Sequence, residues 1–228
     1  GKDLQFEKLV VAPSLGWKID GATDVYLNFE YGKERSYRPI FTVIEIDARK
    51  NPIFVISPKR SPNHNWSYGH IEAKNVQAYV VRRFGRDWTF RQMFNASEAK
   101  GNSLFATDIG RRLNARPRDH NIDWVMEGDL VGLLPIGALK NQFLLGYNYG
   151  RDDGYSLLRR RNIPGIDYKN PNYNTVAPDL NTIPIQSSVD SEKKNWSIFA
   201  QDQMSVLGDK AKLLLGFRYE RLEAESAN

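Results

Sequence analysis

The sequence contains no cysteine and no long apolar run. The absence of cysteine fits an oxidising compartment, where free thiols are a liability, although many proteins of reducing compartments lack it too. No stretch approaches the ~20 consecutive apolar residues of a membrane-spanning helix, so a helical membrane protein is excluded. A membrane β-barrel is not excluded, because its alternating strands average to a modest hydropathy.

Enzyme motifs are also missing. The sequence has no nucleophile signature, phosphate-binding loop or zinc-ligand pattern. Its three histidines, His64, His70 and His120, are too scattered for a metal site, which needs three or four converging donors. We therefore expect no catalytic residue and no protein-bound metal.

The amino-acid composition is that of a folded, moderately basic chain. Its 228 residues are 41% hydrophobic, 26% charged and 12% aromatic, with a formal net charge of +5, which excludes a disordered chain. The basic triplet Arg159–Arg161 is too small to indicate nucleic-acid binding. The first residues lack the apolar core of a signal peptide, so we expect a removed leader or an internal piece of a longer protein.

The hydrophobic pattern has a period of two, which predicts β-strands with one apolar and one polar face. In the return arm of the last hairpin, Leu213, Leu215, Phe217 and Tyr219 alternate with more polar residues. The same pattern recurs in segments 5–20, 25–32, 75–84, 88–96, 122–134, 142–150 and 195–206. We predict an all-β antiparallel meander of about eight strands of a transmembrane β-barrel, with a bend or bulge at Pro13.

Short and long connections alternate along the predicted strands. The short ones lie near residues 21, 86, 136 and 208, and the long ones start near residues 33, 100 and 151. Alternate connections of a meander lie at opposite ends, and outer-membrane barrels have short periplasmic turns and long extracellular loops. Two alternatives stay open: a small complete eight-stranded outer-membrane barrel with an adhesive or structural role, and a soluble β-sandwich binding module.

Four segments resemble the barrels of TonB-dependent siderophore receptors, and they stand in the order found in that family. They are Val10–Tyr31, Asp123–Tyr149, Ile163–Tyr173, and the closing hairpin with WSIFAQDQMSV at Trp196–Val206 and KLLLGFRYERLE at Lys212–Glu223. The resemblance spans essentially the whole chain.

The resemblance implies that residues 1–228 are the middle part of a barrel of about 22 strands around a plugged lumen. The plug domain, the TonB box and the remaining strands would lie outside this chain, which would form an open curved sheet. The resemblance further implies a transporter and receptor that is not an enzyme and has no cofactor. Its expected function is import of ferric siderophores across the bacterial outer membrane by TonB-coupled transport. The expected partners are a ferric siderophore, TonB and lipopolysaccharide, with no nucleic acid; iron would arrive already chelated.

An iron chelate needs aromatic walls and positive charge, so we look for candidate ligand residues where long connections meet strands. They are Arg35, Tyr37, Arg38, Trp66, Tyr68, His70, Arg111, Arg112, Tyr155, Arg159 and Arg160. The alternative for the aromatic residues is a membrane-interface girdle, and for the arginines it is pairing with lipopolysaccharide phosphates or loop carboxylates.

Alternation also predicts which charged side chains face the lumen, where they would contact the plug or a neighbouring strand. These are Arg91, Glu127, Asp129, Arg218 and Glu220. Asp202 is an exception, since it falls in register with the apolar residues of its arm. Either a bulge near Gln201 or a depth close to the periplasmic rim would explain it.

Overall fold

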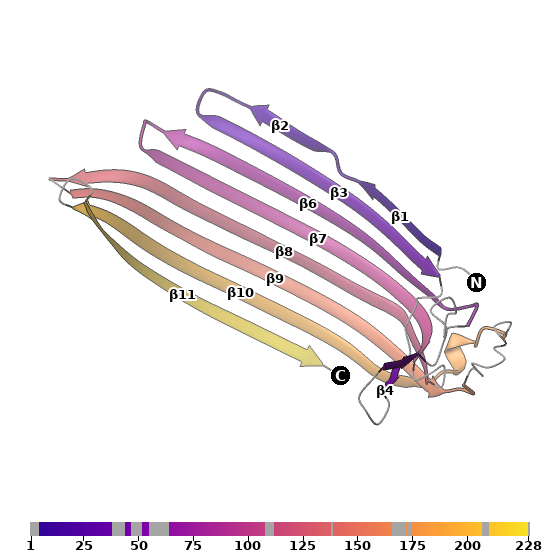
Figure 1. Ribbon diagram of the computed structural model, residues 1–228. Helices are drawn as coiled ribbons and strands as arrows, with labels where there is room; N and C mark the ends of the chain where they lie inside the picture. Colours follow the sequence, from indigo (N-terminus) through magenta and orange to yellow (C-terminus); the bar gives the residue numbers. More distant parts are fainter. Residues whose placement is uncertain are drawn as a thin grey trace.

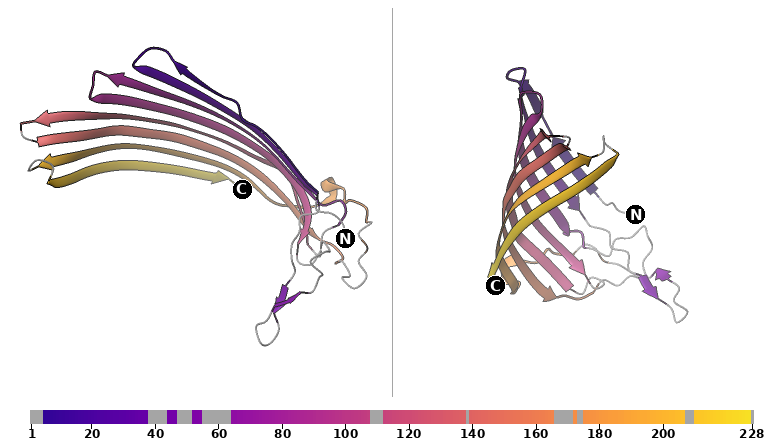
Figure 2. Two further views of the ribbon diagram at one scale, coloured as in Figure 1. Left: turned by 45° about the horizontal axis from the view of Figure 1, so that its top comes forward. Right: turned by 90° about the vertical axis from the view of Figure 1, so that its left-hand side faces the viewer.

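The computed structural model describes residues 5–37, 44–46, 52–54, 64–107, 112–137, 139–165, 172, 175–206 and 210–227. These residues form one large, curved, antiparallel sheet (Figures 1 and 2). A separate small hairpin pairs β4 (Ile44–Ile46) with β5 (Pro52–Phe54), and a 3₁₀ turn, η1 (Leu180–Thr182), precedes β10. Within the described ranges, no helix is long and apolar enough to span a membrane.

The large sheet has nine strands that follow one another in chain order. They are β1 (Gln5–Val11), β2 (Ser14–Lys18), β3 (Thr23–Tyr37), β6 (Tyr68–Phe84), β7 (Trp88–Thr107), β8 (Arg112–Ile136), β9 (Leu139–Asn162), β10 (Ile185–Val206) and β11 (Ala211–Ala227). Both β1 and β2 pair with β3, so the nine strands make eight rows. The break between them contains Pro13, which has no N–H to donate to the ladder, as predicted.

Apolar and charged residues lie on opposite faces of the sheet, as the alternation predicted. The register shows this because directly opposed residues of antiparallel strands share a face. One row across the sheet contains Phe90, Leu130, Leu145, Ala200 and Phe217. The adjacent row, on the other face, contains Arg91, Asp129, Gly146, Phe199 and Arg218. Glu127 and Glu220 lie two residues along the same strands and share this polar face. The predicted grouping of these five charged residues on one face is therefore confirmed.

The sheet is open. In the part of the chain that the structure describes, β11 pairs only with β10, and β1 and β2 pair only with β3, so each side ends in an unpaired edge (Figure 1). The predicted open curved sheet is confirmed, and neither a closed eight-stranded cylinder nor a two-sheet sandwich forms.

The strand ends that the four short connections join lie together at one end of the sheet (Figure 1). Gly85 and Gly137 adopt φ values of 61° and 62° there, a conformation that glycine reaches without strain. The prediction of a long connection starting near residue 100 is wrong. Strands β7 and β8 run to Thr107 and from Arg112, so only residues 108–111 join them. The connection predicted from residue 151 is likewise shorter, since β9 continues to Asn162 and β10 begins at Ile185.

These strand extensions were missed because their outward face is charged rather than apolar. Glu98, Lys100 and His120 occupy the positions that Phe94 and Met126 occupy lower on the same two strands. A strand that lies beyond the membrane needs paired backbone groups but no apolar face. Polar composition alone therefore suggested a loop where the ladder continues.

Asp202 lies on the apolar face with no bulge near Gln201. Strand β10 pairs without a register shift from Ser187 to Ser205, and Asp202 lies opposite Phe143 and Leu215. It is four residues from the end of β10 at the short-turn end. Of the two explanations, depth near the rim is the one that the register supports.

Candidate functional site

The polar face is crosslinked by side-chain hydrogen bonds between neighbouring strands. Four amide and carboxylate pairs lie 3.0–3.1 Å apart, namely Asn28–Gln77, Asn75–Asn95, Asn121–Asp152 and Asn148–Asn195. Nearer the short turns, Arg91 Nε donates to Asp129 Oδ1 at 2.7 Å. The polar side chains of this face thus largely hydrogen-bond to one another, and these bonds make the face rigid as well as hydrophilic.

A hollow lies in this wall towards the end opposite the short turns. Two adjoining cavities of about 400 and 240 Å³ share Ile71, Gly101, Arg116 and Asp119 in their lining. Two glycines keep the hollow open. A Cβ on Gly154 would lie 2.8 Å from Ser191 Oγ, and one on Gly69 would lie 3.0 Å from Ser36 Oγ.

Positive charge borders the hollow. Arg116 Nη1 lies 3.8 Å from Asp119 Oδ2, and the Ser156 hydroxyl donates to Asp119 Oδ1 at 2.5 Å. Because the arginine ion pair is long and half-exposed, Arg116 retains donors for another anion. Arg160, on the same face, donates from Nε to Asn114 Oδ1 at 2.9 Å. Arg112 at the start of β8 completes a group of three arginines on this face.

A bulge in β8 gives Arg116 its position. The pairing of β8 with β7 steps from Asp119 opposite Gly101 to Arg116 opposite Ser103, so β8 carries one extra residue there. The extra residue lies beside Pro117, whose ring cannot donate to the ladder. The bulge thereby keeps both Asp119 and Arg116 on the polar face, although they are three residues apart.

The structure separates the sequence-predicted ligand residues between the two faces. Arg112 and Arg160 lie on the polar face, beyond the residues that line the hollow. Most of the others lie on the opposite face, the continuation of the apolar one, by their register: Arg35, Tyr37, Tyr68, His70, Tyr155 and Arg159. Of these, His70 and Tyr155 nevertheless contribute atoms to the lining of the hollow. Trp66 lies in the turn before β6, and Arg38 and Arg111 lie outside the described residues. Ligand contact by these residues stays a prediction.

Several residues on the opposite face have structural partners. Tyr68 and Trp66 pack against a small core of Leu104, Leu113, Ala115 and Ile183. Arg159 Nη1 donates to the Ile183 carbonyl at 2.8 Å, which ties the segment before β10 to β9. The Arg118 guanidinium lies 6.0 Å from the centre of the Tyr155 ring. These contacts fasten the connecting segments to the strands.

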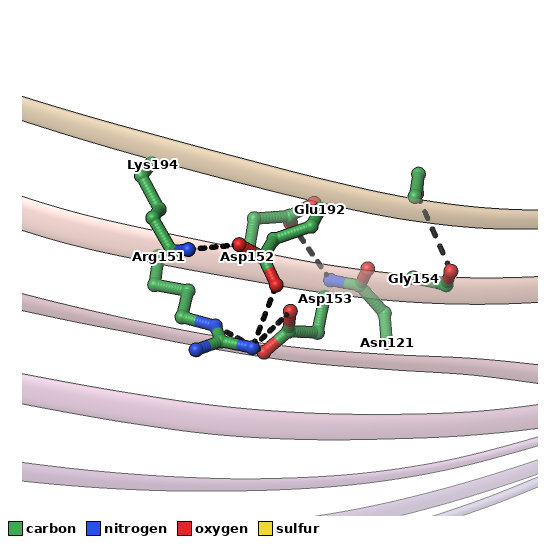
Figure 3. A network of polar contacts seen from close by, with 8 residues as sticks. Asn121, Arg151, Asp152, Asp153, Gly154, Glu192 and Lys194 are labelled. Carbon is green, nitrogen blue, oxygen red and sulfur yellow. Dashed lines mark hydrogen bonds and ion pairs between the residues drawn. The ribbon is translucent and has the colours of Figure 1, made fainter. Parts of the chain in front are cut away.

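This face changes in character along the strands. Next to the apolar rows stand Trp124, Tyr149, Trp196 and Tyr219, with ring centres of neighbouring pairs 5.2 and 5.3 Å apart. Beyond the aromatic rows comes an ionic network (Figure 3). There Arg151 contacts Asp153 at 2.7 Å and Glu192 at 2.9 Å, and Lys194 pairs with Glu192. This order along the strands, from apolar to aromatic to ionic side chains, is typical of a barrel wall that crosses a membrane interface.

The described residues contain no group of three or more His, Asp or Glu side chains placed to hold a metal ion. The sequence-based prediction also missed Arg116, Asp119 and the glycines of the hollow. A local signal existed in the spacing of Arg116, Pro117 and Asp119, but only cross-strand pairing shows that they meet Gly101 and Gly154.

A curved antiparallel sheet with an apolar belt, an aromatic row and a polar opposite face defines the wall of a transmembrane β-barrel. The family model for the TonB dependent receptor-like β-barrel matches residues 16–228. The chain belongs to this family, whose members lie in the bacterial outer membrane.

Known relatives agree with this assignment. The metal-pseudopaline receptor CntO of Pseudomonas aeruginosa PAO1 is 27% identical over 94% of this chain, which covers 31% of the relative's length. The sheet superposes on the ferric-catecholate import receptor Fiu of E. coli K12 with a TM-score of 0.80, at 14% identity over 98% of this chain and 38% of that one. The ferripyoverdine receptor of P. aeruginosa gives 0.74, at 11% identity over 99% and 31%. The chain therefore spans about a third of the length of these relatives.

Proposed function

We propose that this chain forms part of the wall of an outer-membrane receptor that imports a ferric siderophore by TonB-coupled transport. The observation that carries the proposal is the hollow on the polar face, which Arg116 lines, with Arg112 and Arg160 farther along the same face. In a closed barrel the polar face lines the lumen, so these arginines would meet a ligand that enters from outside. The names of the relatives, receptors for chelated metals, support the same class of substrate.

The chemistry of the hollow suits a metal chelate. Such a ligand brings its own metal ligands, so the wall needs only hydrogen-bond donors and positive charge at its rim. Guanidinium groups bind carboxylate or catecholate oxygens with charge-assisted hydrogen bonds. A second candidate substrate is a metal complex of the pseudopaline kind, favoured by the CntO relative.

The open edges support a longer protein. The unpaired edges of β1, β2 and β11 expose backbone donors and acceptors, which a barrel satisfies by pairing further strands. We propose that further strands, a plug and a TonB box complete the receptor. We further propose that lipopolysaccharide contacts the ionic network above the aromatic row.

Uptake by cells tests this function. A strain lacking the gene would be complemented with wild type or an Arg116→Gln, Arg160→Gln double variant, and supplied with labelled ferric siderophores and metal-pseudopaline. We expect one chelate whose uptake needs the gene and TonB, and whose half-saturating concentration rises about tenfold in the double variant. Arg86→Gln, in a turn at the opposite end, is the charge-matched control. Normal uptake of every chelate without the gene would refute the proposal.

A further inference from the structure

A second cavity lies on the other face of the sheet, between the turn before β6 and the segment that follows β9. It encloses about 420 Å³, and its lining includes His64, Trp66, Arg161, Ile163, Thr175 and Pro178. Trp66 and Ile163 also pack on the core formed by Leu104, Leu113, Ala115 and Ile183. The cavity is therefore anchored to the ends of the strands, near η1, whose Leu180 packs on the same core.

A hydrogen-bond chain orients the imidazole at this cavity. Trp66 Nε1–H donates to Thr175 Oγ1 at 2.9 Å, and Thr175 Oγ1 lies 2.9 Å from His64 Nδ1. The indole can only donate, so the threonine oxygen accepts from it and its own proton is available for Nδ1. A neutral imidazole that accepts at Nδ1 carries its proton on Nε2.

The surroundings of His64 favour this neutral state. Its side chain stacks on Trp66 with ring centres 4.6 Å apart and is only 6% exposed. Burial lowers the pKa of His64 below its usual value. Nε2 is buried, and none of the described residues forms a hydrogen bond with it. A buried donor of this kind is satisfied when a ligand oxygen reaches it.

Arg161 supplies positive charge to the same cavity. Among the described lining residues it is the one with a charged side chain. The described residues give it a single polar contact, a long one of 3.4 Å from Nη1 to Thr182 Oγ1. Most of its donors therefore remain available for an anion.

We propose that this cavity binds a small organic anion with an apolar body, of the aryl carboxylate class. The carboxylate would bind Arg161 and the Nε2–H of His64, and the ring would pack against Trp66, Ile163 and Pro178. The walls are mostly apolar, and the one charged side chain among the described lining residues is a cation, which selects against cations and against strongly hydrated sugars. The site is separate from the hollow on the polar face, so it does not depend on the proposed transport function.

Fluorine NMR tests the site directly. The full protein, in lipid nanodiscs, would be titrated into 4-(trifluoromethyl)benzoate at pH 7.5. We expect saturable broadening of the fluorine signal, with affinity reduced about tenfold or more in Arg161→Gln and unchanged in the control Arg86→Gln. The neutral 4-(trifluoromethyl)benzamide should bind about tenfold more weakly than the benzoate.

Two further variants cover loss of folding and the role of the imidazole. Ile163→Trp fills the cavity without removing charge, and His64→Phe keeps the stacked ring but removes Nε2–H; both should weaken binding. Each variant is first checked for the same circular dichroism as wild type. No saturable binding to the wild type, or equal binding by wild type, Arg161→Gln and Ile163→Trp, would overturn the proposal.

Discussion

At the scale of single residues, neighbouring strands pack closely where an aromatic ring on one strand covers a glycine on the next. On the apolar face the ring of Trp88 covers Gly132, and on the polar face Phe199 covers Gly146, so that a Cβ on either glycine would overlap the ring. Arg218 then lies 5.9 Å from the centre of the Phe199 ring. A strand glycine is normally destabilising, and the covering ring offsets this by burying the exposed backbone.

The first prediction concerns Gly132. Gly132→Val should destabilise the folded protein by about 1–3 kcal/mol, because the side chain must displace Trp88 from a well-packed position. The midpoint of urea unfolding, followed by tryptophan fluorescence in detergent, measures this. Gly21→Ala is the control, since a Cβ there meets nothing within 4 Å. Equal midpoints for Gly132→Val and wild type would show that Trp88 does not cover Gly132.

The second prediction concerns His64, whose pKa is lowered by burial when the segment around Thr175 is docked. The docked state binds fewer protons, so docking is strongest above pH 6.5 and weakens as pH falls below it. Arg161, which lines the same cavity, adds repulsion once the imidazole is charged.

Hydrogen exchange of the amides at 175–183 tests this prediction. After correction for intrinsic rates, protection should fall between pH 7.5 and pH 5.5 in wild type and stay constant in His64→Phe. His120→Gln is the control for a histidine elsewhere in the sheet and should retain the wild-type pH dependence. A wild type whose protection does not change with pH would contradict the assignment of a neutral, buried His64.

At the scale of elements, a single strand passes through the apolar belt, the aromatic row and the ionic network. Along one face of β9, Leu145 is followed by Tyr147, Tyr149, Arg151 and Asp153, so the strand goes from an apolar row to the ionic network. The opposite face of the same strand carries Asn148 and Asp152, which bond to neighbouring strands. Each strand is thus selected for different surroundings on its two faces and at its two ends.

The third prediction uses this difference between faces. Leu145→Arg should destabilise the membrane-inserted protein by about 2–4 kcal/mol, because it places a charge in the apolar belt, where Leu145 is 49% exposed. Leu144→Arg, one residue earlier and on the polar face, is the matched control and should be tolerated. Unfolding of both variants in lipid vesicles measures the difference. If Leu144→Arg proved the more harmful, the two faces would be assigned the wrong way round.

At the scale of the whole molecule, the two ends of the sheet differ. The short turns gather at one end, and the hollow and the second cavity lie towards the other. Outer-membrane barrels place short turns in the periplasm. We therefore expect the short turns to lie in the periplasm and both cavities to face the outside of the cell.

The fourth prediction tests this orientation and exploits the lack of native cysteine. Asp190→Cys, beyond the aromatic row, should react on intact cells with a polyethylene-glycol maleimide of about 5 kDa. This reagent is too large to cross the outer membrane, so it labels only cysteines on the outside of the cell. Arg86→Cys, in a short turn, should react only after the cells are broken. The reverse pattern would invert the orientation. Both positions are exposed, so neither substitution should disturb folding.

The sequence by itself determined the strand faces and the tight turns. Alternation is a local property, so Leu145, Arg91 and Asp129 could each be assigned to a face without knowledge of their neighbours. The resemblance of the closing hairpin identified the family, which residues 16–228 confirm. The Pro13 break was predictable for the same reason, since it depends only on a missing N–H.

Only the tertiary structure decided how far the strands extend and which side chains meet at the hollow. Beyond the membrane a strand is held by hydrogen bonds to its neighbours, and those leave no hydrophobic pattern in the sequence. The bulge beside Pro117 shifts the register of β8 by one residue, which brings Arg116 and Asp119 to one face. The face of Tyr37, His70 and Arg159 depends on continuing the ladder through segments taken for loops. Pairing between strands is non-local, and it is this pairing that placed the candidate sites.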